Sequence, residues 1–464
     1  MGGLRDVVLL IVLAGLVPVS ALRPWLGILA WYWIAFMVPH GLTWGFARTL
    51  PVAMLIGGAT LLGWVFTKDR KPIPRTWTVF ALLLLAAHFT LTTMLAYDPQ
   101  LAWGKWEWVS KALLMTFVTM SLFQDRERLR RLYMVTALGL GFYGLKGGLW
   151  VLRTGGGERV YGPDMSFFSD NNTLGLALCM ILPMVLYLSR EEPRPWLKKL
   201  LRVVFWFSVI AILFTYSRGA FLGLVITVTI LIWRSPWRVR FGTAIVIGAL
   251  VAAPLLPGRL WDRIQSIGEQ ESEETRDQST QGRLDAWRVA WDIACERPFT
   301  GAGFRAMWNE DIWNIYYGSK RGFQLHRSTD AHSLYFELLA EQGFVGFGLY
   351  LFVLVSTLVM LRRTRKRWSG HAEHGYLANY AEMTQLCLYS FLVAGAFITV
   401  AYFDLYFYFV ASSVVLRSLS DQAEQSLASG LIGVQPERPA APAARTVPAH
   451  AGRGRVPLAE KRHA

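Results

Sequence analysis

Long apolar stretches separated by short polar segments dominate the chain. They cover residues 4–22, 24–38, 50–67, 77–97, 106–123, 131–152, 172–189, 200–216, 219–233, 241–257, 334–361 and 384–417. Because a helix needs about 20 mostly apolar residues to cross the hydrocarbon layer, we expect an all-α polytopic membrane protein with about twelve transmembrane helices. The last stretch is long enough for two short helices, or for one helix with a hinge near Phe403 and Asp404.

One polar segment between apolar stretches, 257–333, is far longer than the others. The chain therefore divides into N-terminal transmembrane helices (1–256), this large loop with short helices (257–333), C-terminal transmembrane helices (334–419) and a tail (420–464). The tail is rich in Pro, Ala, Arg and Gly and lacks an apolar period, so we expect it to be disordered. The cations of the loop are Arg259, Arg263, Arg276, Arg283, Arg288, Arg297, Arg305, Lys320, Arg321 and Arg327.

Basic clusters indicate the orientation. They lie around 68–71, 126–131, 194–202, 234–240 and 362–367, and the positive-inside rule assigns them to the cytoplasm. The segments 39–49, 98–105, 153–171, the turn at Arg218 and the large loop are then on the outer side, and the tail is cytoplasmic. The first 38 residues break this parity because Arg5 would lie outside, and Pro18 and Pro24 leave broken helices as an alternative. Residues 1–22 lack a convincing cleavage site, so we expect a retained membrane segment.

The composition agrees with a membrane protein and affects how the net positive charge is interpreted. Apolar residues make up 53% of 464 and charged residues 17%, with a net charge of +15. Since the basic residues fall in clusters between spans, membrane orientation explains them, and we expect no nucleic-acid binding. Cys179, Cys295 and Cys387 have no metal-type or disulfide-type spacing. The chain also has no Asp-x-Asp, His-pair or HExxH pattern, so we expect neither a metal nor a cofactor.

The excess of Arg in the large loop indicates a diphosphate ligand, which guanidinium groups bind through paired hydrogen bonds. Residues 282–297 have helical periodicity, and we expect the stripe of Leu284, Trp287, Trp291 and Ala294 to lie on the membrane surface or on other outer loops. Arg283, at the start of this helix, is the favoured ligand. Arg288 is a further candidate, with an ion pair to Asp285 or Asp292 as the alternative.

Two further residues stand out at the ends of apolar stretches. Arg218 lies in the outer turn Ser217-Arg218-Gly219 between two spans, where either function or simple snorkelling explains a lone charge. His332 opens an apolar stretch, with Asp330 as a plausible N-cap. A neutral imidazole kept unprotonated by neighbouring guanidinium groups is a candidate general base, and a surface or capping role is the alternative.

Other polar groups are possible substrate contacts. The outer segment 155–172 carries Arg159, Asn171 and Asn172 among glycines, with a helix start capped by Asp170 or Asn171 as the alternative. Lys146 lies within an apolar stretch, where a buried charge is a functional candidate. Glu341 follows His332 on the same predicted helix. Glu107 and Lys111 lie one turn apart, and for them a structural ion pair is the alternative.

Together, these motifs resemble the O-antigen ligase family. The matching elements are the Ser217-Arg218-Gly219 turn, Arg283-x-x-x-Trp287, Pro298-x-x-Gly301-x-Gly303, and His332 followed by Glu341-x-Gly343. The N-terminal half is similar, more narrowly, to O-glycosylation ligases found with exosortase systems. It shares Trp31-Tyr32-Trp33, Pro39-His40 and Ser166-Phe167-Phe168. Ser333 departs from the pattern, because many relatives have Asn after the His.

The resemblance implies a GT-C-like glycosyltransferase of the bacterial inner membrane with its active site facing the periplasm. Such an enzyme passes a glycan from undecaprenyl diphosphate to a hydroxyl of a periplasmic acceptor, commonly the lipid A core oligosaccharide, with inversion and without a metal. By this resemblance Arg218 and Arg283 would hold the diphosphate and His332 would be catalytic. A repeat-unit polymerase and a protein O-oligosaccharyltransferase remain alternatives, and a lipid-linked glycan flippase is the alternative from another class.

Overall fold

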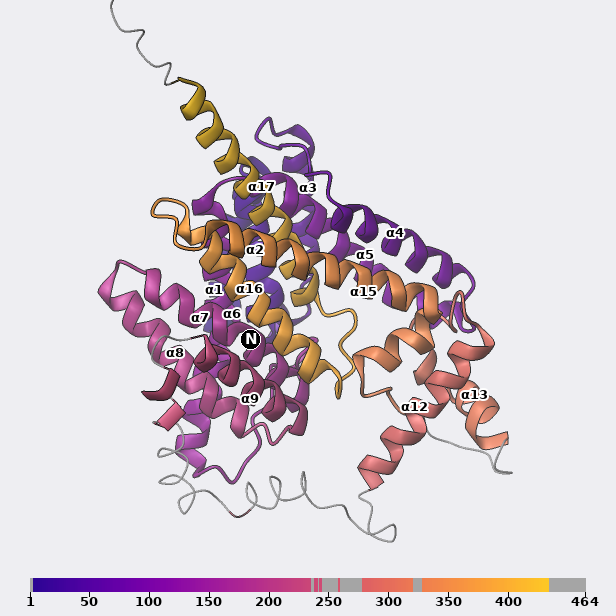
Figure 1. Ribbon diagram of the computed structural model, residues 1–464. Helices are drawn as coiled ribbons and strands as arrows, with labels where there is room; N and C mark the ends of the chain where they lie inside the picture. The colour runs from indigo at the N-terminus through magenta and orange to yellow at the C-terminus, as the bar shows by residue number, and fades with distance from the viewer. Residues whose placement is uncertain are drawn as a thin grey trace, which may run out of the picture. The chain divides into compact units, whose positions relative to one another are not determined.

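A computed structural model describes residues 3–234, 238–240, 242–243, 258, 278–319 and 328–433. Within these ranges every regular element is a helix (Figure 1). The first half contains α1 (Leu4–Leu22), α2 (Pro24–Met37), η1 (Pro39–Leu42), η2 (Phe46–Thr49), α3 (Val52–Phe66), α4 (Trp77–Met94), α5 (Pro99–Leu122), α6 (Arg126–Thr154), α7 (Asn171–Glu191), α8 (Pro195–Leu213) and α9 (Arg218–Trp233). The second half contains α12 (Gln278–Glu296), η4 (Ala306–Trp308), α13 (Glu310–Trp313), η5 (Asn314–Gly318), α15 (Leu334–Trp368), α16 (Gly375–Gly395) and α17 (Asp404–Gly433).

The helices confirm a multi-pass membrane protein. Among the described residues, α1, α4, α6, α7 and α15 are long and apolar enough to cross a bilayer, and α2, α3 and α9 are shorter apolar helices. The count of about twelve spans and the GT-C-like arrangement stay predictions. The expected span at 241–257 lies almost entirely outside the described residues. The loop cations Arg259, Arg263, Arg276, Lys320, Arg321 and Arg327 also lie outside them.

The C-terminal apolar stretch forms two helices. α16 ends at Gly395 and α17 begins at Asp404, which confirms the two-helix alternative. The connection 396–403 lies between them. Of the described residues, those up to Asp421 form one compact unit, and those from Gln422 onward belong to a second. The expectation of a disordered tail is wrong for 420–433, because α17 continues to Gly433 through a segment rich in the helix formers Ala, Gln and Leu.

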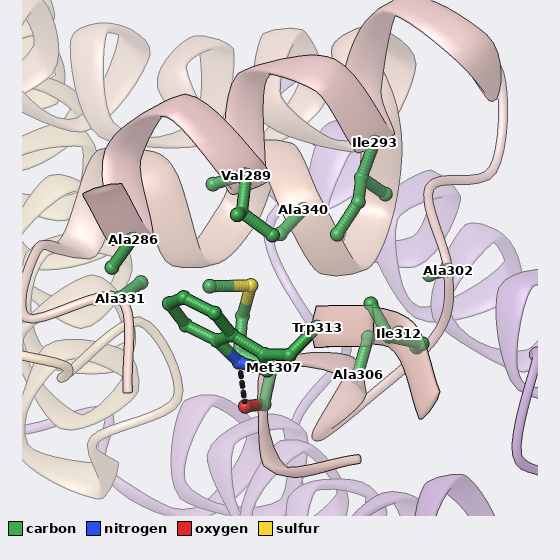
Figure 2. Packing of buried hydrophobic residues seen from close by; sticks show 11 residues of the cluster. Ala286, Val289, Ile293, Ala302, Ala306, Met307, Ile312, Trp313, Ala331 and Ala340 are labelled. Carbon is green, nitrogen blue, oxygen red and sulfur yellow. Dashed lines mark hydrogen bonds between the residues drawn. The ribbon is translucent and has the colours of Figure 1, made fainter. Parts of the chain in front are cut away.

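Helix α12 packs against α15 (Figure 1). Its buried face includes Ala286, Val289, Ala290 and Ile293, which lie over Met307 and Trp313 from the following short helices (Figure 2). This face differs from the stripe expected on the membrane surface or on other outer loops, since only Ala294 of that stripe is buried, whereas Leu284 and Trp287 are half-buried and Trp291 is exposed. Small residues form the close contact, because a Trp ring would hold the helices apart.

The two Trp rings instead contact α15. The Trp287 ring stacks on Phe336, with centroids 5.0 Å apart. The Trp291 ring meets the edge of Phe344, with centroids 5.5 Å apart. The large aromatic side chains therefore flank the small-residue contact, and α12 is held against the N-terminal part of α15.

Three glycines join the loop at 298–303 to α15 at a break in that helix. Gly343 has φ 64° and interrupts the helical backbone, while Gly301 (φ 60°) and Gly303 (φ 90°) turn the loop beside it. The N–H of Gly303 donates to the carbonyl of Glu341 (3.0 Å), and the N–H of Phe344 donates to the carbonyl of Pro298 (2.8 Å). A Cβ at Gly343 would lie 2.6 Å from the Pro298 oxygen, so only glycine fits this left-handed position without strain.

Candidate functional site

His332 lies in the linker immediately before α15, in a left-handed backbone conformation with φ 45°. Its N–H donates to Oγ1 of Thr399 at 3.0 Å. The preceding carbonyl, that of Ala331, accepts a hydrogen bond from Nε1 of Trp287 at 2.9 Å. Contacts from α12 and from the α16–α17 connection therefore fix both sides of the His332 backbone, which supports a conformation that non-glycine residues rarely adopt.

The N-cap expected at Asp330 is wrong. Ser333 precedes the first residue of α15 and is buried, and its side chain makes no capping hydrogen bond. The Asp330 carboxylate accepts a hydrogen bond from Nε1 of Trp308 instead. Because the helix begins one residue after Ser333, Asp330 is too far from the first turn to cap it, and it stands beside His332.

The imidazole of His332 is more than half buried and has charged neighbours from two other parts of the chain. Burial lowers the pKa of His332 below its ordinary value of 6.5, the Arg283 guanidinium lowers it further, and the carboxylates of Asp330 and Asp170 raise it. Desolvation and a nearby cation both disfavour imidazolium. The ring is therefore neutral near neutral pH and has Arg283 from α12 and Asp170 from the start of α7 as electrostatic partners.

Asp170 and Asn171 attach the start of α7 to the turn before α9. The Asp170 carboxylate accepts from the N–H groups of Asn172 (2.8 Å) and Thr173 (3.0 Å), so it caps α7. Nδ2 of Asn171 donates to the carbonyl of Thr215 at 2.8 Å. The capping alternative is thus confirmed at Asp170, while the Asn171 side chain holds the neighbouring turn. Asn172 is half-buried beside it.

Arg218 is the first residue of α9, with Ser217 as the N-cap, whose side chain accepts from the N–H of Ala220 at 3.3 Å. Tyr216 before it has φ 54°, so the chain turns sharply at this point. A Cβ at Gly219 would lie 3.3 Å from Cβ of Phe397 in the connection 396–403, and 3.3 Å from the carbonyl of Ala394 at the end of α16. The start of α9 therefore packs on the connection that carries Thr399, the residue hydrogen-bonded to His332.

Arg283 and Arg288 lie in different surroundings although both belong to α12. Arg283 is half-buried and acts on His332. The Arg288 side chain is 64% exposed and pairs with Asp285 at 3.4 Å, whose other oxygen accepts from the Tyr317 hydroxyl at 2.7 Å. The ion-pair alternative thus describes the geometry of Arg288, and Arg283 is the α12 cation at the His332 site.

Glu341 is buried beneath the loop that contains Arg305. Its Oε1 accepts a hydrogen bond from the N–H of Arg305 at 2.7 Å. Arg305 itself has φ 59°, so the carboxylate secures a strained turn just after Gly303. We therefore assign Glu341 a positioning contact in this structure; direct contact with substrate stays a prediction.

A second group of ionisable residues, which the sequence did not reveal, surrounds Lys105. Its Nζ lies 4.4 Å from the ring centroid of Trp108, 5.2 Å from that of Phe167 and 5.5 Å from that of Tyr402. Its electrostatic partners include Glu337, Glu341 and Asp404. Glu337 also accepts from the N–H of Ala401 at 2.8 Å. The sequence offered one indication of this group: Lys105 lies next to a predicted span, and Asp404 lies inside another apolar stretch.

The remaining candidates lie elsewhere. Lys146 is exposed, so the protein does not bury this charge, because α6 presents it to a cavity rather than to neighbouring helices; its contact with substrate stays a prediction. Arg159 is exposed and lines the same cavity. Glu107 and Lys111 are also exposed, and their 2.6 Å ion pair confirms the structural alternative. Across the described ranges, no group of three potential His, Cys, Asp or Glu ligands could hold a metal ion.

Comparison with known families separates the chain into two regions. Residues 4–192 match a family of unknown function, DUF5935. Residues 203–351 match a family described as O-Antigen ligase. No curated protein matches the chain. Arg218, Arg283 and His332 all fall in the second region, whereas Asp170, which acts electrostatically on His332, comes from the first.

Proposed function

Because the chain belongs to the O-antigen ligase family, a family of ligase- and polymerase-type glycan transfer, we propose that it moves a glycan from undecaprenyl diphosphate to a hydroxyl of a periplasmic acceptor. The lipid A core oligosaccharide is the proposed acceptor. The protein would reside in the bacterial inner membrane with the site facing the periplasm. The observation that carries the proposal is the neutral His332 beside Arg283, hydrogen-bonded to Thr399 of the connection that also contacts Gly219, the neighbour of Arg218.

The charges support different roles for the arginines and for His332 in this reaction. Arg218 and Arg283 would bind the donor diphosphate, because guanidinium groups match phosphate oxygens in charge and geometry. As the bond between the anomeric carbon and the diphosphate oxygen breaks, negative charge grows on the leaving group. Cations placed beforehand at this position stabilise that charge. Arg288 would contribute less, since its guanidinium is exposed and engaged by Asp285.

His332 would take the proton of the attacking hydroxyl. The hydroxyl oxygen forms the new glycosidic bond from the side opposite the diphosphate, so the anomeric configuration inverts. The imidazolium produced would be stabilised by Asp330 and Asp170, whose carboxylates favour the charged form. This scheme uses side chains alone, and we propose that it needs no metal and no cofactor.

Reconstitution tests the proposal directly. The purified chain in lipid vesicles receives an undecaprenyl-diphosphate glycan and a lipid A core acceptor, and the product is followed by mass spectrometry and its anomer by NMR. We expect transfer with inversion, unaffected by a chelator and abolished in His332→Ala. Wild-type turnover in His332→Ala, or loss of activity on chelation, would contradict this mechanism.

The same assay distinguishes the alternative functions, because each one gives a different outcome. Acceptance of a second lipid diphosphate glycan, with chain extension, would identify a repeat-unit polymerase. Transfer to a Ser or Thr hydroxyl of a protein would identify an O-oligosaccharyltransferase. Movement of the lipid-linked glycan between leaflets without any new glycosidic bond would identify a flippase.

A further inference from the structure

A cationic cavity lies beside α6, and its lining includes none of the residues of the His332 site. It has a volume of 780 Å³ and is lined by Lys146 and Arg153 of α6 and by Arg159 from the segment that follows. Three cations face it against a single carboxylate, Glu158. An adjoining cavity of 420 Å³ also includes Lys146 in its lining, together with Arg5 and Arg48. The charge of this region therefore favours an anionic ligand.

The three cations of the larger cavity are not neutralised by the protein. Within the part of the chain that the structure describes, Lys146, Arg153 and Arg159 make no ion pair and no side-chain hydrogen bond. Two other exposed cations differ, since Arg48 pairs with Asp164 at 3.1 Å and Lys111 pairs with Glu107 at 2.6 Å. Unpaired cations concentrated in a concave site provide charge-assisted hydrogen bonds for phosphate oxygens.

The position of Lys146 indicates that the ligand is a lipid. Lys146 lies eight residues before the end of α6 at Thr154, which corresponds to about 12 Å along the helix axis. α6 is one of the helices that could cross the bilayer, and an uncompensated cation at such a depth is costly. Exposed Trp150 and Tyr161 line the same cavity, and these residue types are typical of the membrane–water interface.

The cavity wall is continuous with the elements that carry Arg218 and Asp170. The N–H of Val160 donates to the carbonyl of Phe214 at 3.1 Å, and the N–H of Gly162 donates to the carbonyl of Ser169 at 3.0 Å. The Tyr216 hydroxyl donates to the carbonyl of Gly156. The segment that forms this wall is therefore hydrogen-bonded to residues one or two positions before Asp170 and Arg218, and neither His332 nor Arg283 lines the cavity.

We propose that this cavity binds the phosphate group of the lipid-anchored acceptor, while Arg218 and Arg283 hold the donor diphosphate. This inference rests on the proposed function, because only a transferase with two lipid-borne substrates needs a second phosphate site. The phosphate anchors the acceptor lipid beside the segment 155–162, and the acceptor glycan extends from there toward His332. A free phosphate ion and the headgroup of a bilayer phospholipid also present phosphate oxygens. The test therefore distinguishes the acceptor phosphate from these two.

The test measures binding by native mass spectrometry of the full chain in phosphatidylcholine nanodiscs. The probes are bis-phosphorylated lipid A and the same lipid with both phosphates removed. We expect the phosphorylated probe to bind the wild type and Lys146→Gln to bind it about tenfold or more weakly, as for the loss of one charge-assisted hydrogen bond. Lys146→Arg should restore binding, and Lys111→Gln, the matched control outside the cavity, should bind as the wild type.

Three results would overturn the proposal: equal binding of both probes, equal binding by Lys146→Gln and the wild type, or displacement by equimolar phosphatidylglycerol or inorganic phosphate. Displacement of this kind would identify a bilayer-lipid or free-phosphate site instead. Thermal unfolding of each variant confirms that it is folded. A second variant, Arg159→Gln, lies on an exposed segment outside α6 and tests the same site without altering a helix.

A parallel transfer assay keeps this inference separate from the proposed function. Phosphate-dependent binding through Lys146 without any transfer from the lipid-linked donor would leave the second site intact and refute the glycosyltransferase. Transfer by Lys146→Gln with an unchanged KM for the phosphorylated acceptor would refute the second site and leave the glycosyltransferase intact. We expect a raised acceptor KM with a nearly unchanged donor KM.

Discussion

The N–H of His332 donates a hydrogen bond to Oγ1 of Thr399 at 3.0 Å, although the two residues are 67 positions apart in the sequence. This bond ties the start of α15 to the connection between α16 and α17. The same connection contacts Gly219, next to Arg218. A single short segment thus sets the relative positions of the proposed base and one proposed diphosphate ligand.

Replacing Thr399 should therefore impair catalysis more than substrate binding. Thr399→Val removes the acceptor and leaves the His332 N–H without its partner, at a cost of about 1–3 kcal/mol if the group remains buried. We expect kcat to fall about tenfold or more through misplacement of the imidazole, with a small change in donor KM. Thr399→Ser keeps the hydroxyl and should retain most activity. Equal kcat values for Thr399→Val and the wild type would show that this bond does not position His332.

The charges around His332 predict opposite pH shifts for two variants. Protonation removes the base, so activity is lost as pH falls through the His332 pKa, which lies below 6.5. Arg283 lowers this pKa, so Arg283→Gln should move the acid limb of the kcat profile to higher pH. Asp330 raises it, so Asp330→Asn should move the limb to lower pH. Shifts of the same sign in both variants would contradict the arrangement.

The two arginines of α12 should differ in their effect on donor binding. Arg283→Gln removes a cation beside His332, and the loss of a charge-assisted hydrogen bond of about 1.5–3 kcal/mol should weaken donor binding or turnover by tenfold or more. Arg288→Gln removes an exposed ion pair with Asp285, worth about 1 kcal/mol or less. Donor titration of both variants, with Arg218→Gln alongside, measures the difference. A larger loss in Arg288→Gln would reverse the assignment.

The break in α15 provides a stability test with a matched control. Gly343→Ala puts a Cβ 2.6 Å from the Pro298 oxygen at a position with φ 64°, so it should destabilise the protein by on the order of 1–3 kcal/mol. Gly348→Ala, on the same helix with no neighbour within 4 Å of the new Cβ, should be neutral or stabilise by up to about 1 kcal/mol. Thermal unfolding in detergent compares them. Equal Tm values for the two variants would show that the contact with Pro298 does not require a glycine at position 343.

Much of the fold follows from local patterns that the sequence displays. The apolar stretches predict helices at nearly the right places, and the 282–297 periodicity predicts α12. The same periodicity did not identify the buried face of α12, because Ala286 and Ala290 allow close approach to α15 while Trp287 and Trp291 pack at its flanks. Which apolar residues face inward depends on the shape of the partner helix, and the sequence of one helix does not contain that information.

The candidate site likewise contains residues that the sequence predicts and residues that it does not. Arg283 and His332 are recognisable because charged and titratable groups stand out near apolar stretches, and the structure brings these two together. Thr399 and Lys105 were not predicted. A lone Thr in an apolar stretch carries no signal, and the rings around Lys105 come from Trp108, Phe167 and Tyr402, far apart in the chain. Long-range pairing of this kind appears only in the folded arrangement.

The break at Gly343 gives the two parts of α15 separate axes. An uninterrupted helix of 35 residues would measure about 52 Å, well beyond a hydrocarbon layer of about 30 Å. Transmembrane helices respond to such hydrophobic mismatch by tilting. The loop at 298–303 is hydrogen-bonded to the residues around the break. We therefore expect the part of α15 after Gly343 to tilt in the membrane, while the part before Gly343 keeps its position against the loop. Bilayers of different thickness should then leave the height of His332 above the lipid headgroups nearly constant.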